Sequence, residues 1–336
     1  MLKVTTSDGF IGWSECVALS EPVYSPEYVA GCLDQMKRFL IPTLLAAPEL
    51  SPQLVAPLLQ GFLGSPMAKA TLETALLDAE LRSKTLSLAD FLGANKSKIP
   101  CGVSVGIAPS IDRLLEEVNS YITQGYKRIK LKIEPGWDLE PVSAVRSAWP
   151  EIPLQVDANQ AYSRADGALL AKLDQFELLL IEQPLDEHDI IGHAQLSQRV
   201  ATPICLDESI ISLRSAQDAL AMKATTVINI KPGRVGGYLE AVKIHDLCLS
   251  EGIPVWCGGM LETGIGRAAN VALAALPGFT LPGDTSASSR FYERDITEPF
   301  IMQDGYLEVP QTLGIGRVPD MDFMESITSH QETISI

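Results

Sequence analysis

The sequence predicts an α/β protein in which parallel strands alternate with helices, and three observations carry this prediction. From about residue 100, short apolar runs rich in β-branched residues alternate with longer segments of helical periodicity. There are eight such runs, and they recur at even spacing. Five of them end in a charged residue at nearly the same interval along the chain. This alternation implies a parallel barrel or a doubly wound sheet, and the count of eight favours the barrel.

The region before residue 99 has a different pattern. Its first segment, LKVTTSDGFIGWSE (residues 2–15), predicts a hairpin, because Asp8-Gly9 is a favourable turn. Two helical patterns follow, at 25–46 and 67–84. We therefore expect residues 1–98 to form an α+β capping domain.

The alternating region supplies the strands of the predicted barrel, which we place at residues 99–290. The eight strand candidates are residues 100–107, 128–133, 153–159, 178–184, 202–208, 226–232, 253–259 and 279–284. Segments such as 110–124 and 239–252 have the periodicity of the helices between them. After about residue 290 the alternation stops, and FIMQDGYLEVPQ predicts a short hairpin. We expect residues 291–336 to return to the cap.

Composition and charge exclude several classes of function. A net charge of −16 argues against a nucleic-acid partner or an acidic membrane surface, since both favour basic proteins. No apolar run is long enough to span a bilayer, and no leader follows Met1. The six cysteines lie far apart and form no C-x-x-C pair, which predicts buried free thiols in a reducing cytoplasm.

The charged strand ends are the strongest functional signal in the chain. They are spaced by 25, 25, 25 and 24 residues, about the length of one strand-helix unit: Lys132, Asp157, Glu182, Asp207 and Lys231. For any single residue, a solvated loop charge would be the simpler explanation. Five in register instead predict a cluster at the carboxyl ends of the strands, where barrel enzymes keep their active sites.

The three carboxylates of this set come from adjacent strands and should converge. Close carboxylates repel one another unless a cation lies between them. An all-oxygen set suits a hard ion, and three carboxylates that leave further positions open favour Mg²⁺ over Ca²⁺. Zinc is disfavoured because histidine and cysteine ligands are missing from the pattern.

Lys132 and Lys231 end the second and sixth strands, so they should face each other across the mouth. A substrate carboxylate on the metal would then have a lysine on each side of its reacting carbon. We expect a nearby cation and a second lysine, Lys130, to lower the pKa of the lysine that acts as a base. The metal would stabilise the ene-diolate that forms when the α-proton leaves.

Several motifs together resemble a known family over nearly the whole chain. RIKLKI, DAN, IEQP, LDES and NIKPGRVGG are similar to the muconate-lactonizing subgroup of the enolase superfamily. PCGVSVGI, IPVWCGGMLETGIGRAANVALA and LPGDTSAS bring the resemblance closest to o-succinylbenzoate synthases and N-acylamino acid racemases. The resemblance implies a (β/α)₇β barrel, of the TIM-barrel type, with an α+β cap formed by the N-terminal region and the C-terminal tail.

The resemblance also implies roles for individual residues. Lys132 and Lys231 would be the acid/base catalysts, and Mg²⁺, with Mn²⁺ able to substitute, would be bound by Asp157, Glu182 and Asp207. Lys130 and Asn159 would contact the substrate carboxylate or tune its neighbours, and Glu208 would support a metal ligand. Five more positions resemble substrate-contacting positions of the barrel or cap, although a structural role explains them equally well: Ser104, Gly259, Leu261, Leu19 and Tyr24.

The activity implied first is that of o-succinylbenzoate synthase, a Mg²⁺-dependent syn-dehydration in menaquinone biosynthesis. The alternative is racemisation of N-acylamino acids such as N-succinylamino acids, or both activities. A muconate cycloisomerase-like enzyme and a non-catalytic barrel are more remote. Dipeptide epimerases carry Asp-x-Asp after the eighth strand, whereas Asp284 here is followed by Thr285 and Ser286. We expect a small carboxylate substrate and a homo-oligomer.

Two further expectations concern the start of the chain and a glycine-containing motif near residue 264. The family has another cap strand and a lid loop before the segment that begins at Leu2, so we expect the physiological chain to be longer. GIGRAA, at 264–269, also matches the G-x-G-x-x-A pattern of dinucleotide-binding domains. That pattern opens the first strand-helix unit of such a domain, whereas this one follows the seventh strand. A nicotinamide-dependent dehydrogenase is therefore disfavoured.

Overall fold

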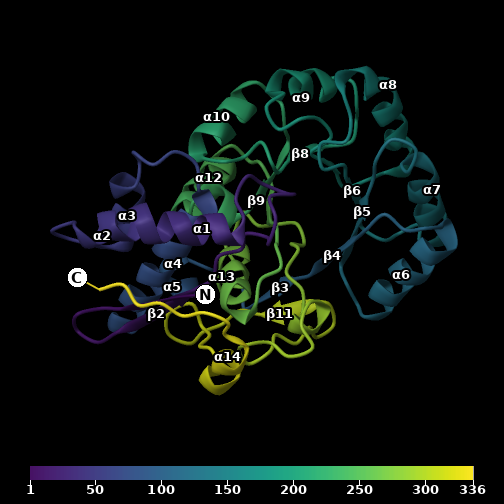
Figure 1. Ribbon diagram of the computed structural model, residues 1–336. Helices are drawn as coiled ribbons and strands as arrows, with labels where there is room; N and C mark the ends of the chain where they lie inside the picture. Colours follow the sequence, from purple (N-terminus) through teal and green to yellow (C-terminus); the bar gives the residue numbers. More distant parts are fainter. Residues whose placement is uncertain (336) are drawn as a thin grey trace.

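Seven parallel strands form the central sheet of the computed structural model, which describes residues 1–335. Each strand pairs with the next in chain order, so the sheet winds in one direction (Figure 1). The strands are β4 (Gly102–Val105), β5 (Arg128–Lys132), β6 (Leu154–Asp157), β7 (Ile181–Glu182), β8 (Ile204–Leu206), β9 (Val227–Ile230) and β10 (Val255–Cys257). Parallel pairing in sequence order brings all carboxyl ends to one rim, as the spacing of the charges predicts.

The eighth predicted strand closes the ring without forming a regular strand. Residues 279–284 lie between β10 and β4, where Phe279 bridges to Val255 and Gly283 bridges to Cys101. The Gly102 amide donates to the Gly283 carbonyl at 2.7 Å. Pro282 has no amide hydrogen to donate, so a continuous ladder cannot form through this segment. The expectation of a full eighth strand is therefore corrected to a bridging segment.

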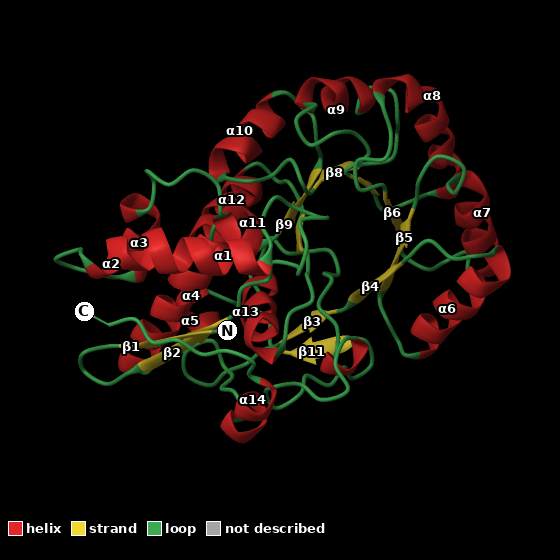
Figure 2. Ribbon diagram, in the orientation of Figure 1, coloured by secondary structure: helices red, strands yellow, loops and turns green. Residues whose placement is uncertain are grey.

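Helices cover the outer side of the ring, as Figure 2 shows. Longer ones are α6 (Ile111–Thr123), α7 (Leu139–Ala148), α9 (Ile190–Leu196), α10 (Leu213–Ala221), α12 (Tyr238–Ser250) and α13 (Gly264–Ala274), and shorter ones are η2 (Arg164–Asp166), α8 (Gly167–Leu170), η3 (Ala171–Phe176), α11 (Pro232–Val235) and η4 (Ser288–Arg290). Helix α6 illustrates why these segments form helices that pack against the ring. Ser110 caps its first turn by accepting from the Arg113 amide, and its apolar stripe buries Leu114 and Val118.

The N-terminal region forms a hairpin and a group of helices beside the barrel. Strands β1 (Leu2–Thr5) and β2 (Ile11–Ser14) pair antiparallel, with Gly9 in the left-handed region that the predicted turn requires. The helices are α1 (Val29–Gln35), η1 (Met36–Leu40), α2 (Ile41–Leu45), α3 (Pro52–Leu58), α4 (Pro66–Ser83) and α5 (Leu88–Leu92). Helix α4 is buried on most sides because it lies between the hairpin and the barrel: the Trp13 amide donates to Asp78 and the Leu239 amide to Glu73.

The C-terminal segment runs back to the N-terminal region, as Figure 1 shows. Strand β11 (Tyr306–Glu308) pairs antiparallel with β3 (Lys98–Pro100), and α14 (Met321–Ile327) follows. The hairpin expected over 300–311 is reduced to a single bridge between Gln303 and Tyr306. The local pattern identified the strand correctly but not its partner, which lies some 200 residues earlier.

All six cysteines are free, and five of them are buried, as the sequence predicts. Within residues 1–335, none of the helices has both the length and the apolar character needed to cross a bilayer. A small apolar cluster of Leu180, Cys205, Val227 and Trp256 lies inside the ring, where the Trp256 ring centroid is 4.8 Å from the Lys130 ammonium.

Candidate active site

Lys130 and Lys132 project from the same face of β5, and that face is the inside of the ring. The Lys130 ammonium lies 2.7 Å from Asp284, 3.1 Å from Glu182 and 3.4 Å from Asp157. Burial alone would lower the pKa of Lys130, but these carboxylates outweigh it and raise the pKa well above its usual value. The Lys130 charge is thus balanced by three carboxylates of the chain, and the expectation that it lowers the pKa of a neighbouring lysine stays a prediction.

Lys132 lies further out, at the mouth, where about 30% of its side chain is exposed. Its ammonium donates to Asp157 at 2.6 Å and also to the Asn159 side-chain carbonyl. Asn159 is held in turn by Glu208, whose carboxylate accepts from its amide nitrogen at 2.9 Å. Glu208 is buried, which raises its pKa. The sequence predicts both Asn159 and Glu208 as site residues, and in the structure the two connect to Lys132 through a chain of hydrogen bonds.

The three predicted metal ligands lie at neighbouring strand ends and are almost inaccessible to solvent. Asp157 pairs with Glu182 across β6 and β7, and Asp207 follows β8. Burial, and then repulsion from Asp157, raise the pKa of Glu182 to about 8. Burial works in the same direction at Asp207, but Arg234 and Lys231 overcome it and lower the pKa of that carboxyl. The local sequence explains the placement, because each carboxylate ends a short, buried, apolar strand.

The donor chemistry of these carboxylates fits a divalent cation. They are carboxylate oxygen donors in a buried place, and the pKa of Glu182 is raised by burial and, second, by repulsion from Asp157, which a cation would relieve. Across residues 1–335, no three acidic, histidine or cysteine side chains are arranged as a ready metal cage. The carboxylates are instead engaged by basic groups of the chain, Lys130 and Lys132 at Asp157 and Lys231 at Asp207.

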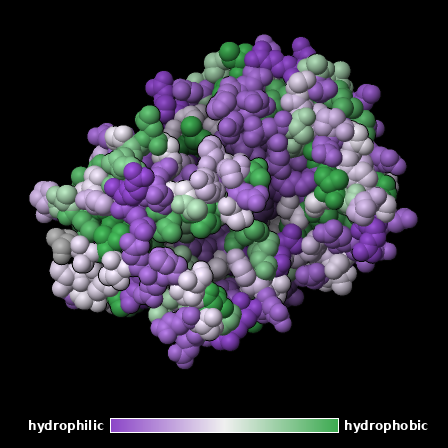
Figure 3. Space-filling model, viewed as in Figure 1, coloured by the Kyte–Doolittle hydropathy of each residue, from purple (hydrophilic) through white to green (hydrophobic). Residues whose placement is uncertain are grey.

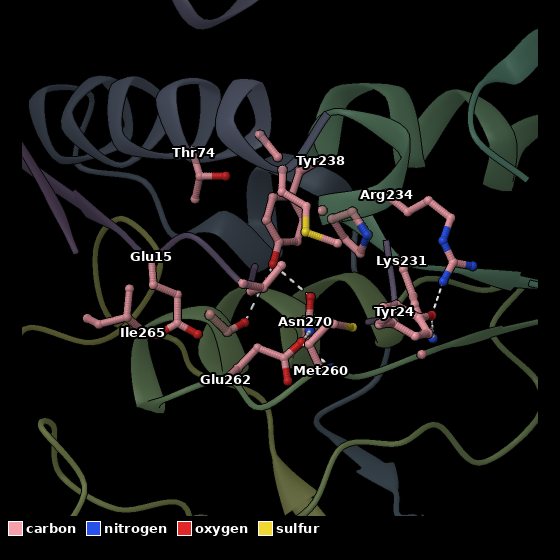
Figure 4. A pocket seen from close by; sticks show the side chains of 17 residues that line it. Glu15, Tyr24, Thr74, Lys231, Arg234, Tyr238, Met260, Glu262, Ile265 and Asn270 are labelled. Atoms are coloured by element: carbon pink, nitrogen blue, oxygen red, sulfur yellow. Dashed lines mark hydrogen bonds between the residues drawn. The ribbon is translucent and has the colours of Figure 1, made fainter. Parts of the chain in front are cut away.

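Lys231 lies on the opposite side of the ring, at the junction of β9 and α11. Its ammonium donates to Asp207 at 2.8 Å and to the Tyr24 hydroxyl at 2.6 Å. Burial would lower the pKa of Lys231, yet Asp207 outweighs it and raises the pKa. Arg234, one helical turn later, donates to both Asp207 and Tyr24. The contacts of Lys231 and Arg234 with Tyr24 are drawn in Figure 4.

The cavity of Figure 4 lies beside this cluster, between the N-terminal region and the barrel. Its volume is about 40 Å³, and its lining includes Tyr24, Lys231, Glu15 and Glu262. A space of this size holds water molecules but not a substrate as large as an N-acylated amino acid. Figure 3 shows a hollow near the middle of this face, with hydrophilic residues gathered along its upper side.

The five remaining predicted contact residues differ in how they are placed relative to the proposed catalytic groups. Ser104 lies on β4 in register with Lys130, and its carbonyl accepts from Arg290. Gly259 lies against the backbone of Asp284, where a β-carbon would be too close. Leu19 pairs through its backbone with Tyr28, and Leu261 is 55% exposed. Of the five positions, Tyr24 alone has a polar side-chain contact to the proposed catalytic groups among the residues the structure describes.

Four residues of the site were missed by the sequence reasoning: Arg128, Asn229, Arg234 and Asp284. Arg128 precedes Lys130 by two residues, so strand alternation could have placed it on the same face. Strand alternation could also have placed Asn229, which precedes Lys231 by two residues. Its side-chain amide donates to Glu182 at 2.9 Å. Asp284 ends the eighth apolar run, the position at which the other charges were recognised. Arg234 lies in a helical turn after its strand, where the 25-residue spacing carries no information.

The dinucleotide-binding interpretation of GIGRAA has no support in the structure. This segment begins α13, and its first amides are already bonded to side chains of the chain itself. The Gly264 amide donates to Asp295 at 2.9 Å, and the Thr263 amide donates to Glu15 at 3.0 Å. Two carboxylates thus occupy the place where a pyrophosphate would bind.

Comparison with known proteins identifies both parts of the chain. Residues 1–93 match the N-terminal domain of the mandelate racemase / muconate lactonizing enzyme family. Residues 113–323 match the enolase C-terminal domain-like family. The two matches together cover most of the chain.

Individual relatives agree with these matches. The chain is 56% identical to an N-succinylamino acid racemase of Amycolatopsis sp. over 98% of its own length and 89% of the relative's. It is 45% identical to the o-succinylbenzoate synthase of Bacillus subtilis over 100% of its length and 90% of that protein's. A crystal structure of an enolase superfamily member from Listeria innocua matches with a TM-score of 0.93 at 41% identity, covering 96% of this chain and 88% of that one.

Proposed function

The chain belongs to the enolase superfamily, with the domain pair of mandelate racemases and muconate lactonizing enzymes, and from this premise we propose that it is an N-succinylamino acid racemase. It falls in the subgroup of N-succinylamino acid racemases and o-succinylbenzoate synthases. The sequence motifs put the synthase first. The similarity to curated relatives favours the racemase, at 56% identity against 45%.

The observation that carries the proposal is the pair of lysines on opposite sides of the ring. Lys132 ends β5 and Lys231 follows β9, four strands away in the sheet order. Racemisation requires one group to remove the α-proton from one side of the carbon and another to return a proton to the opposite side. Two lysines that face each other can perform both directions, each acting on one enantiomer.

Asp157, Glu182 and Asp207 would hold Mg²⁺, with Mn²⁺ able to substitute. When bound, Mg²⁺ supplies Lewis-acid stabilisation of negative charge on the substrate carboxylate. The chain's own residues orient the bases: Asn159 contacts the Lys132 ammonium, and Tyr24 contacts that of Lys231. The free thiols agree with a reducing compartment such as the cytoplasm.

Hydrogen–deuterium exchange at the α-carbon tests the proposal directly. Wild-type protein with Mg²⁺ in D₂O should exchange the α-proton of both enantiomers of an N-succinylamino acid. Lys132→Ala should abolish the exchange of one enantiomer, and Lys231→Ala that of the other. The matched control is Lys172→Ala, which removes an exposed lysine that is distant in sequence from both Lys132 and Lys231. Wild-type protein that exchanges neither enantiomer would refute the racemase, and if it also fails to catalyse the dehydration, a non-catalytic barrel would be favoured.

The second candidate is o-succinylbenzoate synthase, favoured by 45% identity to the Bacillus subtilis enzyme over the whole chain. The same lysines and carboxylates would serve a syn-dehydration, in which one lysine removes the α-proton. Racemisation and formation of o-succinylbenzoate should therefore be measured side by side on one preparation. Efficient dehydration without racemisation would replace the racemase by the synthase, and turnover in both assays would assign both activities.

A further inference from the structure

A buried ion pair, Arg128 and Asp284, lies directly behind the carboxylate cluster and has no role in the reaction proposed above. Arg128 is fully buried. Its guanidinium donates at 2.8 Å both to Asp284 and to the Pro282 carbonyl, and at 3.3 Å to the Val103 carbonyl. It therefore ties the first strand of the ring to the segment that closes it.

Burial of this pair constrains the neighbouring strand and requires that the arginine charge be partnered. A β-carbon at Gly102 would overlap the Arg128 guanidinium, so the neighbouring strand needs a glycine there. A buried arginine is tolerated only with a partner and filled hydrogen bonds, because an unpaired buried charge is strongly destabilising. Arg128 thus fixes Asp284 by one oxygen and leaves its second oxygen facing Lys130.

Lys130 is the group that this second oxygen controls. Three carboxylates surround the Lys130 ammonium, and the nearest is Asp284, at 2.7 Å. Among the described residues, Asp284 is also the one whose contact with Lys130 has hydrogen-bond geometry. Glu182 and Asp157, at 3.1 and 3.4 Å, are in ion-pair contact only. The strongest of the three attractions therefore directs the ammonium away from the proposed metal ligands.

An ammonium and a metal ion compete for the same carboxylate oxygens. Without Asp284, the Lys130 ammonium would keep Glu182 and Asp157 as its remaining partners and would bind them more closely. We propose that Asp284, fixed by Arg128, is a positioning residue that draws the Lys130 ammonium toward itself and so weakens its competition with a divalent cation for Asp157 and Glu182. This inference rests on the metal site of the proposed function.

Calorimetric titration of the 336-residue protein with Mg²⁺ tests the inference without relying on activity. Asp284→Asn keeps the shape of the side chain but removes its charge, and it should weaken Mg²⁺ binding by about 10- to 100-fold. The double variant Asp284→Asn with Lys130→Met removes the competing ammonium as well. It should recover most of the lost affinity, which a merely structural role of Asp284 would not produce. Asp322→Asn, on the exposed side of α14, is the matched control.

Each outcome has a definite meaning. Unchanged Mg²⁺ affinity in Asp284→Asn, or no recovery in the double variant, would overturn the inference while leaving the metal site intact. Wild-type protein that binds neither Mg²⁺ nor Mn²⁺ would reject the metal site, and with it the inference. Should Asp284→Asn fail to fold, Arg128→Lys carries the test. It keeps a buried positive charge but loosens Asp284, so it should weaken Mg²⁺ binding in the same direction, and an unchanged affinity there would also refute the inference.

Discussion

Tyr24 is the residue through which the N-terminal region reaches the proposed chemistry. Its hydroxyl accepts from Lys231 at 2.6 Å and donates to Asp207 at 3.4 Å. Burial raises the pKa of Tyr24, so the phenol stays protonated near neutral pH. The neutral Tyr24 hydroxyl orients the Lys231 ammonium. Because it carries no negative charge, it does not make the ammonium harder to deprotonate.

Replacing this tyrosine should therefore affect one lysine more than the other. Tyr24→Phe removes a hydrogen bond to a charged group, which contributes about 1.5–3 kcal/mol. We expect exchange of the enantiomer served by Lys231 to slow by roughly tenfold or more, with a smaller effect on the enantiomer served by Lys132. Isotope exchange on each pure enantiomer measures this. Tyr28→Phe, four residues on and 39% exposed, is the control, and equal slowing of both enantiomers would contradict the prediction.

Single residues of the site were predictable where chain spacing encodes position. Lys132, Asp157, Glu182, Asp207 and Lys231 could be found because each strand-helix unit has nearly the same length. The raised pKa of Lys130 could not be foreseen, because it depends on Asp284, which is 154 residues away. A spacing pattern reveals that charges share a rim. It does not reveal which opposite charge each of them meets.

Among the elements, α4 connects the N-terminal helices to the barrel through a buried carboxyl. Glu73 is 2% exposed and accepts from the Leu239 amide at 3.1 Å, in the first turn of α12. Burial raises the pKa of Glu73 from 4.5 to about 7. The folded protein therefore keeps a proton on this carboxyl at a pH where the unfolded chain has lost it.

This shift predicts how stability depends on pH. The stabilisation from the bound proton is fully present below about pH 4.5 and is lost as pH rises through 7. Glu73→Gln keeps an acceptor for Leu239 but carries no charge. Relative to the wild type, its free energy of unfolding should rise by up to about 3 kcal/mol between pH 4.5 and 8. Denaturant titrations at several pH values measure this, with the exposed Glu325→Gln as control, and parallel curves for Glu73→Gln and wild type would disprove it.

For strands, the sequence predicts where each one lies along the chain better than it predicts which strand it pairs with. The apolar runs located β4 to β10, and Asp8-Gly9 located the first hairpin, since both signals are local. The eighth run failed as a strand because Pro282 interrupts its hydrogen bonding. The partner of β11 was missed because β3 lies far away in the chain, and strand periodicity carries no information about partners.

The whole molecule depends on the return of its C-terminal segment. Asp78 of α4 accepts from the Trp13 amide of the first hairpin and from the Ile315 amide of the C-terminal segment, each at 2.8 Å. Leu307 of β11 and Ile315 are buried in the main apolar core. Three distant parts of the chain thus meet at one helix.

Two truncations should separate the essential from the dispensable part of this segment. A chain ending at Thr328 loses residues 329–335, which are exposed, and with them the surface ion pair between Lys37 and Glu332, which contributes little. Its unfolding temperature should stay close to that of the intact protein. A chain ending at Asp304 loses β11 and Ile315, and we expect it not to fold cooperatively. Circular dichroism during heating distinguishes the two, and a cooperative transition in the shorter chain would contradict this view.

The contact between Tyr24 and Lys231 limits how this protein can be recombined with its relatives. A chimera made by exchanging everything before residue 98 would place a foreign residue against the lysine of one proton-transfer step. Selection for a new substrate through changes in the N-terminal region would then also alter the chemistry at the barrel's lysine. We therefore expect successful chimeras to be those whose crossover keeps residues 24, 231 and 234 from the same parent.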